Sequence, residues 1–204
     1  MITVKIKDML NAVDLLYNEW DLGKFASRAK GKICAWIYLM EILEESEKII
    51  VEKENSDLIG FCGYAKWNSK KKLASKRMYH FIKKVLLKSP LIKNKKAIVK
   101  YNNDYNYLPE KLKNYFDGEV SIIIVNKKYR GKGIGKKMLL RIFDLAEEDN
   151  MKNLQILTDE SCNFKFYECC GCKKVYETII SNGEPNKCKS ASEIGYIYEK
   201  RFKK

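Results

Sequence analysis

The residues best suited to chemistry form one short segment rich in glycine and lysine, Tyr129-Arg-Gly-Lys-Gly-Ile-Gly-Lys-Lys-Met138. It follows a strongly apolar run and precedes a run with helical periodicity, so we expect it to link a buried strand to a helix. Glycines let the backbone approach a ligand with its N–H groups exposed, and a helix N-terminus adds positive potential. Four basic side chains strengthen that potential: Arg130, Lys132, Lys136 and Lys137. The segment therefore predicts a binding site for an anionic group, most naturally a phosphate.

Two common phosphate-binding motifs do not fit this segment. The P-loop requires a glycine, four further residues and then Gly-Lys-Ser/Thr. If Gly135 and Lys136 supplied its end, Arg130 would occupy the first glycine position and Lys137 the Ser/Thr position. The dinucleotide-binding Gly-x-Gly-x-x-Gly motif would place Lys136 or Met138 at its third glycine. What remains is a different phosphate-binding loop, or a glycine-rich turn without a ligand.

The segment and its surroundings resemble the GNAT superfamily of acyl-CoA N-acyltransferases. The run Arg-Gly-Lys-Gly-Ile-Gly at residues 130–135 matches the family signature Arg/Gln-x-x-Gly-x-Gly/Ala. The residues that lead into it from Val125 are similar to the family's Val-x-Pro-x-Tyr-Arg, with Lys127 in place of the proline. Further on, the run that ends in Cys172 is similar to a family helix ending in Phe-Tyr-Glu-x-x-Gly-Phe, with that cysteine in place of the last aromatic residue. The resemblance covers residues 119–175.

The resemblance implies roles for particular residues. Backbone groups around Val125 would pair with the pantetheine arm of CoA, as an added strand does. Asn163 lies where the family commonly contacts the cofactor. Tyr167 lies where a tyrosine often protonates the leaving CoA thiolate, a step that suits a phenol, although a core aromatic residue is the alternative. The CoA pyrophosphate would be held by the signature segment, which comprises Arg130, Gly131, Lys132, Gly133, Ile134, Gly135 and Lys136.

Several groups could act as the general base. The amine must be uncharged to attack the thioester, so a carboxylate must accept its proton, directly or through water. Glu119 begins the apolar strand at the position where some family members keep a catalytic glutamate, although it also suits an ordinary strand end. Asp159 and Glu160 follow or end the next parallel strand and are alternatives, because such strand ends border the cleft in α/β sheets.

The cysteines and the single histidine favour no other chemistry. Cys169 and Cys172 form a C-x-x-C pair, and a zinc site can be drawn by adding Cys162 and Cys188. No second C-x-x-C pair or histidine pair completes such a site. A hydrolase with a cysteine or serine nucleophile would need a histidine partner, and His80 falls in a basic helix, where we expect it at the surface. We therefore expect reduced thiols and no metal.

The positive charge is concentrated in one stretch. The chain of 204 residues carries 40 Lys+Arg against 26 Asp+Glu, a formal net charge of +14. Residues 58–103 contain 12 lysines and Arg77 but no acidic residue. Arginine is the better residue for reading phosphates and bases, so an excess of lysine favours a solvated surface, and we do not expect a nucleic-acid partner. Residues 68–106 are interpreted as a lysine-rich helical insertion.

The compartment can be inferred from what the sequence lacks. No segment is long and apolar enough to cross a bilayer, and the N-terminus shows no signal peptide. Seven cysteines without such a signal indicate reduced thiols. We therefore expect a cytoplasmic protein without a membrane partner, either a monomer or a homodimer.

Periodicity predicts the elements that would position the candidate residues. Apolar residues at helical spacing predict helices, and β-branched apolar runs predict strands. Strand, loop, helix and strand follow one another around the glycine-rich segment, which indicates a βαβ unit with parallel strands. The predicted helices cover 7–17, 30–46, 72–88, 136–148 and 163–170; the predicted strands cover 48–54, 58–67, 119–125, 153–158, 174–180 and 193–198, with a further short strand at 97–101.

These elements predict a single-domain α/β protein over residues 1–204. The resemblance implies a GNAT fold, with a mixed, mostly antiparallel central sheet that is splayed at the cofactor site and flanked by helices. It also implies an N-acetyltransferase that moves an acetyl group from acetyl-CoA to a primary amine of a small-molecule acceptor, with Trp36 and Tyr38 as candidates for the acceptor wall. A protein or peptide acceptor, a CoA-binding protein without catalysis and a nucleic-acid-binding module on the same scaffold are the alternatives.

Overall fold

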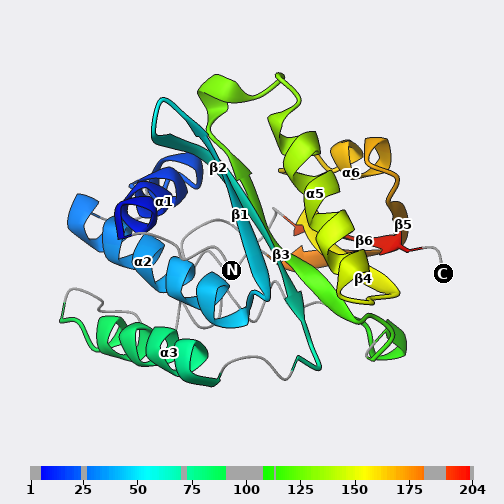
Figure 1. The fold of residues 1–204 in the computed structure, drawn as a ribbon, viewed down its shortest axis with the longest axis horizontal. Helices are drawn as coiled ribbons and strands as arrows, with labels where there is room; N and C mark the ends of the chain where they lie inside the picture. Colours follow the sequence, from blue (N-terminus) through cyan, green and yellow to red (C-terminus); the bar gives the residue numbers. More distant parts are fainter. Residues whose placement is uncertain are drawn as a thin grey trace. The chain divides into compact units, whose positions relative to one another are not determined.

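The computed structural model describes residues 6–23, 27–69, 73–90, 108–112, 114–181 and 192–202. Among these residues, six strands form a mixed, mostly antiparallel sheet in the order β1-β2-β3-β4-β6-β5, flanked by helices (Figure 1). This confirms the predicted α/β class. The chain divides into two compact units: unit 1 comprises residues 1–93 and 121–146, and unit 2 comprises residues 94–120 and 147–204.

Unit 1 contains a β-hairpin made of β1 (Lys48–Glu54) and β2 (Asp57–Lys66), as predicted. Asn55 and Ser56 close it with φ values of 47° and 75°. Two-residue hairpin turns favour this left-handed conformation because it matches the twist of the flanking strands. β2 is buried along almost its whole length, which indicates that both of its faces are covered.

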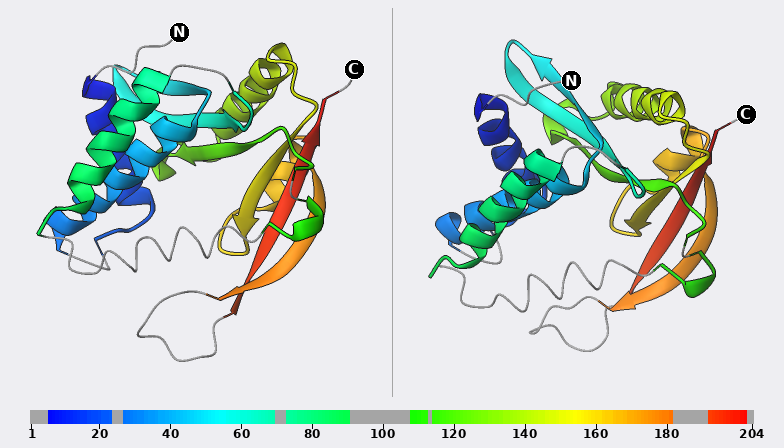
Figure 2. Two further views of the ribbon diagram at one scale, coloured as in Figure 1. Left: turned by 90° about the horizontal axis from the view of Figure 1, so that it is seen from below. Right: turned by 60° about the horizontal axis from the view of Figure 1, so that its bottom comes forward.

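One face of this part of the sheet is covered by α1 (Ile6–Glu19) and α2 (Arg28–Glu45) (Figure 1). The helix α3 (Leu73–Leu87) lies against α2 (Figure 2), so the helix predicted over 72–88 is confirmed. Apolar residues from these helices and from the strands share one core, which includes Leu16, Leu39, Met40, Phe61, Ile122 and Ile124, with Tyr79, Ile82 and Leu86 of α3 packed against it.

The other face of β2 meets α5 (Ile134–Glu148), next to β3 (Gly118–Val125). Gly60 permits this close packing, since a Cβ there would lie 2.8 Å from the carbonyl oxygen of Ile124 and 3.0 Å from the Cε atom of Met138. The hydroxyl of Tyr64 donates to the carbonyl oxygen of Leu145 over 3.1 Å. Because side chains alternate along a strand, α5 covers the face of β2 opposite α1 and α2.

Unit 2 contains the antiparallel strands β4 (Asn153–Asp159), β6 (Ser192–Arg201) and β5 (Lys173–Ser181), with β6 between the other two (Figure 2). β4 pairs with the start of β3 in parallel, through Glu119 and Gln155, as predicted. The short helix α6 (Lys165–Cys169) is shorter than the predicted helix over 163–170. The left-handed Gly171, with a φ value of 77°, follows its end, as is common where helices stop.

Part of the lysine-rich stretch and the short strand predicted at 97–101 fall outside the described residues. None of the helices in the described part of the chain is both long enough and apolar enough to cross a membrane.

Candidate functional site

The glycine-rich segment leaves β3 through the 3₁₀ helix η2 (Lys127–Tyr129) and enters α5 at Ile134, two residues before the predicted start at 136. Gly131 and Gly133 have φ values of 78° and 77°. This conformation costs residues with a Cβ about 1–2 kcal/mol. A Cβ at either position would meet nothing within 4 Å. The backbone therefore requires the glycines, and open space lies beside them.

The N–H groups of this segment are available to a ligand. The N–H of Lys137 donates to the carbonyl oxygen of Gly133 over 2.9 Å. This bond closes the first turn of α5 and explains why the helix starts early. Within the described part of the chain, the six N–H groups from Gly131 to Lys136 have no acceptor. Together with the positive end of the helix dipole, this row suits the two phosphates of a pyrophosphate.

Residues at the start of the segment anchor it to the sheet. The N–H of Asn126 donates to the carbonyl oxygen of Ile59 in β2 over 2.8 Å. The Asn126 side chain accepts a hydrogen bond from the N–H of Lys128 over 3.0 Å. The Nε atom of Arg130 donates to the carbonyl oxygen of Val125 over 3.0 Å. The segment therefore starts from a fixed position, although Gly131 and Gly133 are exposed.

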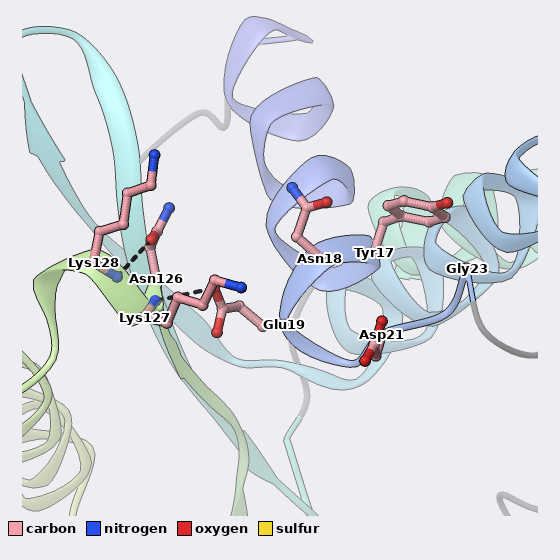
Figure 3. A pocket seen from close by; sticks show the side chains of 8 residues that line it. All are labelled: Tyr17, Asn18, Glu19, Asp21, Gly23, Asn126, Lys127 and Lys128. Carbon is pink, nitrogen blue, oxygen red and sulfur yellow. Dashed lines mark hydrogen bonds between the residues drawn. The ribbon is translucent and has the colours of Figure 1, made fainter.

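A pocket of about 350 Å³ lies beside this anchor, between the end of α1 and the residues that follow β3 (Figure 3). Glu19, the last residue of α1, accepts a hydrogen bond from the N–H of Lys127 over 3.0 Å and forms an ion pair with Arg130. Trp36 and Tyr38, the candidates for an acceptor wall, do not line this pocket. Its lining residues are Tyr17, Asn18, Glu19, Asp21, Gly23, Asn126, Lys127 and Lys128.

Side chains around the segment also contact the β1–β2 hairpin. The Nζ atom of Lys137 lies 2.6 Å from the Oε1 atom of Glu52. A hydrogen bond to Glu54 raises the pKa of Tyr129. The Nζ atom of Lys132 lies 5.1 Å from the centre of the Tyr129 ring, within the range of a cation–π contact. These contacts keep positive side chains close to the row of N–H groups.

Glu119, the predicted general base, is half-buried in unit 2. The Nε2 atom of Gln155 donates to its Oε2 atom over 2.9 Å, and Gln155 itself is 2% exposed. Burial raises the pKa of Glu119, and the hydrogen bond from Gln155 offsets part of that rise. A carboxylate with a raised pKa is a stronger base, which suits the removal of a proton from an amine.

The two alternative carboxylates are engaged in structural hydrogen bonds. The Oδ1 atom of Asp159 accepts from the N–H and the hydroxyl of Ser161, over 2.8 and 2.5 Å. It therefore fixes the turn that follows β4. The Oε1 atom of Glu160 accepts from the N–H of Ile194 in β6 over 3.2 Å. These contacts favour Glu119 over both alternatives as the base.

Tyr167, the predicted acid, lies buried in α6. Its ring centre is 5.4 Å from that of Phe166 and 5.6 Å from that of Tyr198, whose hydroxyl donates to Glu168 over 2.9 Å. Asn163 is exposed just before α6, and its carbonyl oxygen accepts from the N–H of Phe166 over 3.1 Å. Tyr167 and Asn163 thus belong with Glu119 to unit 2, whereas the glycine-rich segment belongs to unit 1.

Among the described residues, the cysteines show no arrangement typical of a zinc site. Cys162 and Cys169 are exposed, Cys172 is buried, and Cys188 lies outside the described residues. Burial raises the pKa of Cys172 to about 12. Among the described residues, no group of three or more His, Cys, Asp or Glu could hold a metal ion. The side chain of His80 is 45% exposed and pairs with a glutamate of α2.

Sequence reasoning did not identify Glu19 or Gln155. Neither belongs to a motif, and each depends on a contact between residues far apart in the sequence. An acidic residue at the C-terminal end of a helix is disfavoured by the helix dipole, which indicates a compensating partner elsewhere. The predicted helix ended at residue 17, so this signal for Glu19 appears only once the structure extends α1 to that residue.

Comparisons with known proteins agree with the family resemblance and with the fold described above. Residues 97–172, which contain every predicted site residue, match the family model described as the acetyltransferase (GNAT) family. A comparison with curated protein sequences finds no match. A structure from Pyrococcus horikoshii OT3 is similar with a TM-score of 0.59 and 19% identity, over 100% of this chain and 96% of that one.

Two further structures share the fold over nearly their whole length. A Desulfovibrio desulfuricans protein described as being of the GNAT family has a TM-score of 0.55 and 12% identity, over 98% of this chain and 95% of that one. An aminoglycoside 6′-N-acetyltransferase complexed with coenzyme A has a TM-score of 0.57 and 10% identity, over 98% and 94%. At such identities the structures establish the fold alone. The match to the GNAT family model over residues 97–172 and the shared fold agree with the resemblance that the sequence indicated.

Proposed function

We propose that the protein is an N-acetyltransferase that transfers the acetyl group of acetyl-CoA to a primary amine of a small-molecule acceptor. The observation that carries this proposal is the row of N–H groups from Gly131 to Lys136, which have no acceptor in the described part of the chain. The row lies at the start of α5, and two of its glycines are in the left-handed conformation. Such a row is a preformed site for a pyrophosphate.

In this proposal, the glycine-rich segment supplies most of the contacts to acetyl-CoA. The segment Gly131, Lys132, Gly133, Ile134, Gly135 and Lys136 donates its N–H groups to the pyrophosphate, and Arg130 adds positive charge. Val125 offers backbone groups to the pantetheine arm. Its carbonyl oxygen already accepts from Arg130, and a carbonyl oxygen can accept a second hydrogen bond. Asn163 is proposed to contact acetyl-CoA as well, because the resemblance implies that role.

The reaction replaces the C–S bond of a thioester with the C–N bond of an amide. Acetyl-CoA supplies the electrophilic acyl carbon. Glu119 accepts the proton that the amine must lose, directly or through water, and burial favours this role because it raises the pKa of the carboxyl group. Tyr167 donates its phenolic proton to the leaving sulfur and regains one from solvent. The net result is one proton moved from the amine to the thiol of CoA.

A small molecule is proposed as the acceptor because an aminoglycoside acetyltransferase is among the structures with the same fold. That similarity does not identify the compound, so the test uses a panel.

The test follows thiol release from acetyl-CoA in the presence of primary amines and peptides, with the products identified by mass spectrometry. We expect at least one small amine to accelerate release and to gain one acetyl group. Acceleration by peptides alone would reassign the acceptor to a protein. Binding of acetyl-CoA without any turnover would leave a CoA-binding protein, and absence of binding would overturn the proposal.

A further inference from the structure

We propose that Glu19 is a positioning residue: through Arg130, it holds the start of the glycine-rich segment in the conformation that binds acetyl-CoA. The inference rests on the proposed function, because it assigns Glu19 a part in acetyl-CoA binding. In this role Glu19 acts on the segment and does not touch the ligand.

Glu19 makes two polar contacts with residues that follow β3. Its Oε1 atom accepts from the N–H of Lys127 over 3.0 Å (Figure 3). Its Oε2 atom pairs with the Nη2 atom of Arg130. The Nε atom of the same guanidinium donates to the carbonyl oxygen of Val125 over 3.0 Å. A single arginine side chain therefore ties the end of α1 to the last residue of β3.

The position of Glu19 shows that these contacts are needed. It is the last residue of α1, where the negative end of the helix dipole disfavours a carboxylate, and the last turn contains no basic residue. Its side chain is only 5% exposed, whereas that of Arg130 is 58% exposed. A carboxylate with so little access to water depends on its charged and hydrogen-bonding partners, so Glu19 and Arg130 should be strongly coupled.

Arg130 directly precedes Gly131, so its position determines where the row of N–H groups begins. Gly131 and Gly133 give the segment two points of easy rotation, because glycine adopts many backbone conformations at little cost. Without Glu19, Arg130 would keep the contact with Val125 but lose its ion pair. Acetyl-CoA would then have to order the segment on binding, which lowers affinity without changing the chemical step.

The variant Glu19→Gln tests the positioning role, because glutamine has nearly the same shape as glutamate. Glutamine keeps an oxygen for the N–H of Lys127 but lacks the charge that pairs with Arg130. We expect the Kd and the KM for acetyl-CoA to rise roughly tenfold, with kcat within about twofold of the wild type. The matched control is Asp14→Asn, on the same helix, which removes a carboxylate that is 61% exposed and pairs with Lys32. The control should leave the Kd unchanged.

A double-mutant cycle with Arg130→Gln separates positioning from general destabilisation. Because Glu19 acts through Arg130, the double variant should bind acetyl-CoA no more weakly than Arg130→Gln alone. If Glu19→Gln fails to fold, Glu19→Asp keeps the charge but shortens its reach, and the Kd should rise about threefold.

The outcomes separate this inference from the proposed function. Wild-type affinity in the folded Glu19 variant, or losses that add independently in the cycle, would overturn the positioning role and leave the acetyltransferase proposal intact. A wild-type protein that does not bind acetyl-CoA would overturn the proposed function itself.

Discussion

Glu119 and Gln155 form the contact on which the proposed proton transfer depends. Burial raises the pKa of Glu119, and the hydrogen bond from Gln155 only partly opposes this. Only the ionised carboxylate can accept a proton, so activity should be lost as the pH falls through this raised pKa. We therefore predict that kcat/KM rises with pH, and that the midpoint of this rising limb lies above the ordinary pKa range of glutamate. The midpoint is read from a pH profile of kcat/KM, which reports the ionisation of groups in the free enzyme.

The variant Glu119→Gln identifies the source of that limb. It should remove the limb and lower kcat by roughly 100-fold, the size typical of a lost general base. Glu160→Gln is the control, because Glu160 bonds to the backbone of β6 and should leave the limb in place. A limb that persists in Glu119→Gln would exclude Glu119 as the base.

Tyr167 makes a second prediction at the scale of one residue. Tyr167→Phe keeps the ring that packs near Phe166 and Tyr198, so the variant should fold. Loss of the phenolic proton should lower kcat by roughly 100-fold with little change in KM for acetyl-CoA. Tyr176→Phe, on β5, serves as the control and should keep full activity. Unchanged turnover in Tyr167→Phe would remove the phenol from the mechanism.

The loop between β3 and α5 carries the prediction at the scale of elements. Gly133→Ala forces a residue with a Cβ into a φ of 77°, at a cost of about 1–2 kcal/mol, although the Cβ itself meets nothing within 4 Å. If binding requires this conformation, the Kd for acetyl-CoA should rise roughly 5- to 30-fold by calorimetry.

Gly171→Ala is the matched control for the loop variant. Gly171 has the same φ of 77°, and a Cβ there would approach only the Nζ atom of Lys200, at 3.6 Å. It should lower the Tm without weakening acetyl-CoA binding. Equal losses of affinity in the two variants would show that strain in general, and not the loop, controls binding.

Elements with strong periodicity could be predicted from the sequence. The helical spacing of apolar residues in α3 was visible without the structure, as was the apolar run of β3. Which side of α3 packs was predicted only in part: Ile82 and Leu86 pack against the core, but Met78, Phe81 and Val85 are exposed and Tyr79 packs instead.

The predicted start of α5 was two residues too late, because glycine lowers helix propensity. In the structure the helix begins at Ile134, since the N–H groups of its first residues, Ile134 and Gly135, need no acceptor within the helix. The anchoring contacts of Glu19 could not be predicted, since ion pairs between distant segments leave no local pattern.

The whole chain should respond to acetyl-CoA, because a ligand that binds only the folded state stabilises it. At 100 times the Kd, the gain is about 2.7 kcal/mol. For a chain of this size, that corresponds to a rise in Tm of about 5–10 °C, measured by thermal unfolding. Adenosine, which lacks the pyrophosphate, should cause no shift. No shift with acetyl-CoA at any concentration would contradict the assignment of the glycine-rich segment.

Each compact unit is assembled from two separate stretches of the chain. Residues 94–120 of unit 2 are synthesised before residues 121–146 complete unit 1, and β3 begins in one unit and ends in the other. Many multidomain proteins complete their N-terminal domain during synthesis before the next domain begins. A nascent chain of this protein cannot follow that order, because unit 2 starts before unit 1 is finished. Neither unit is encoded by one continuous stretch of the gene. A single recombination event therefore cannot transfer one unit without part of the other.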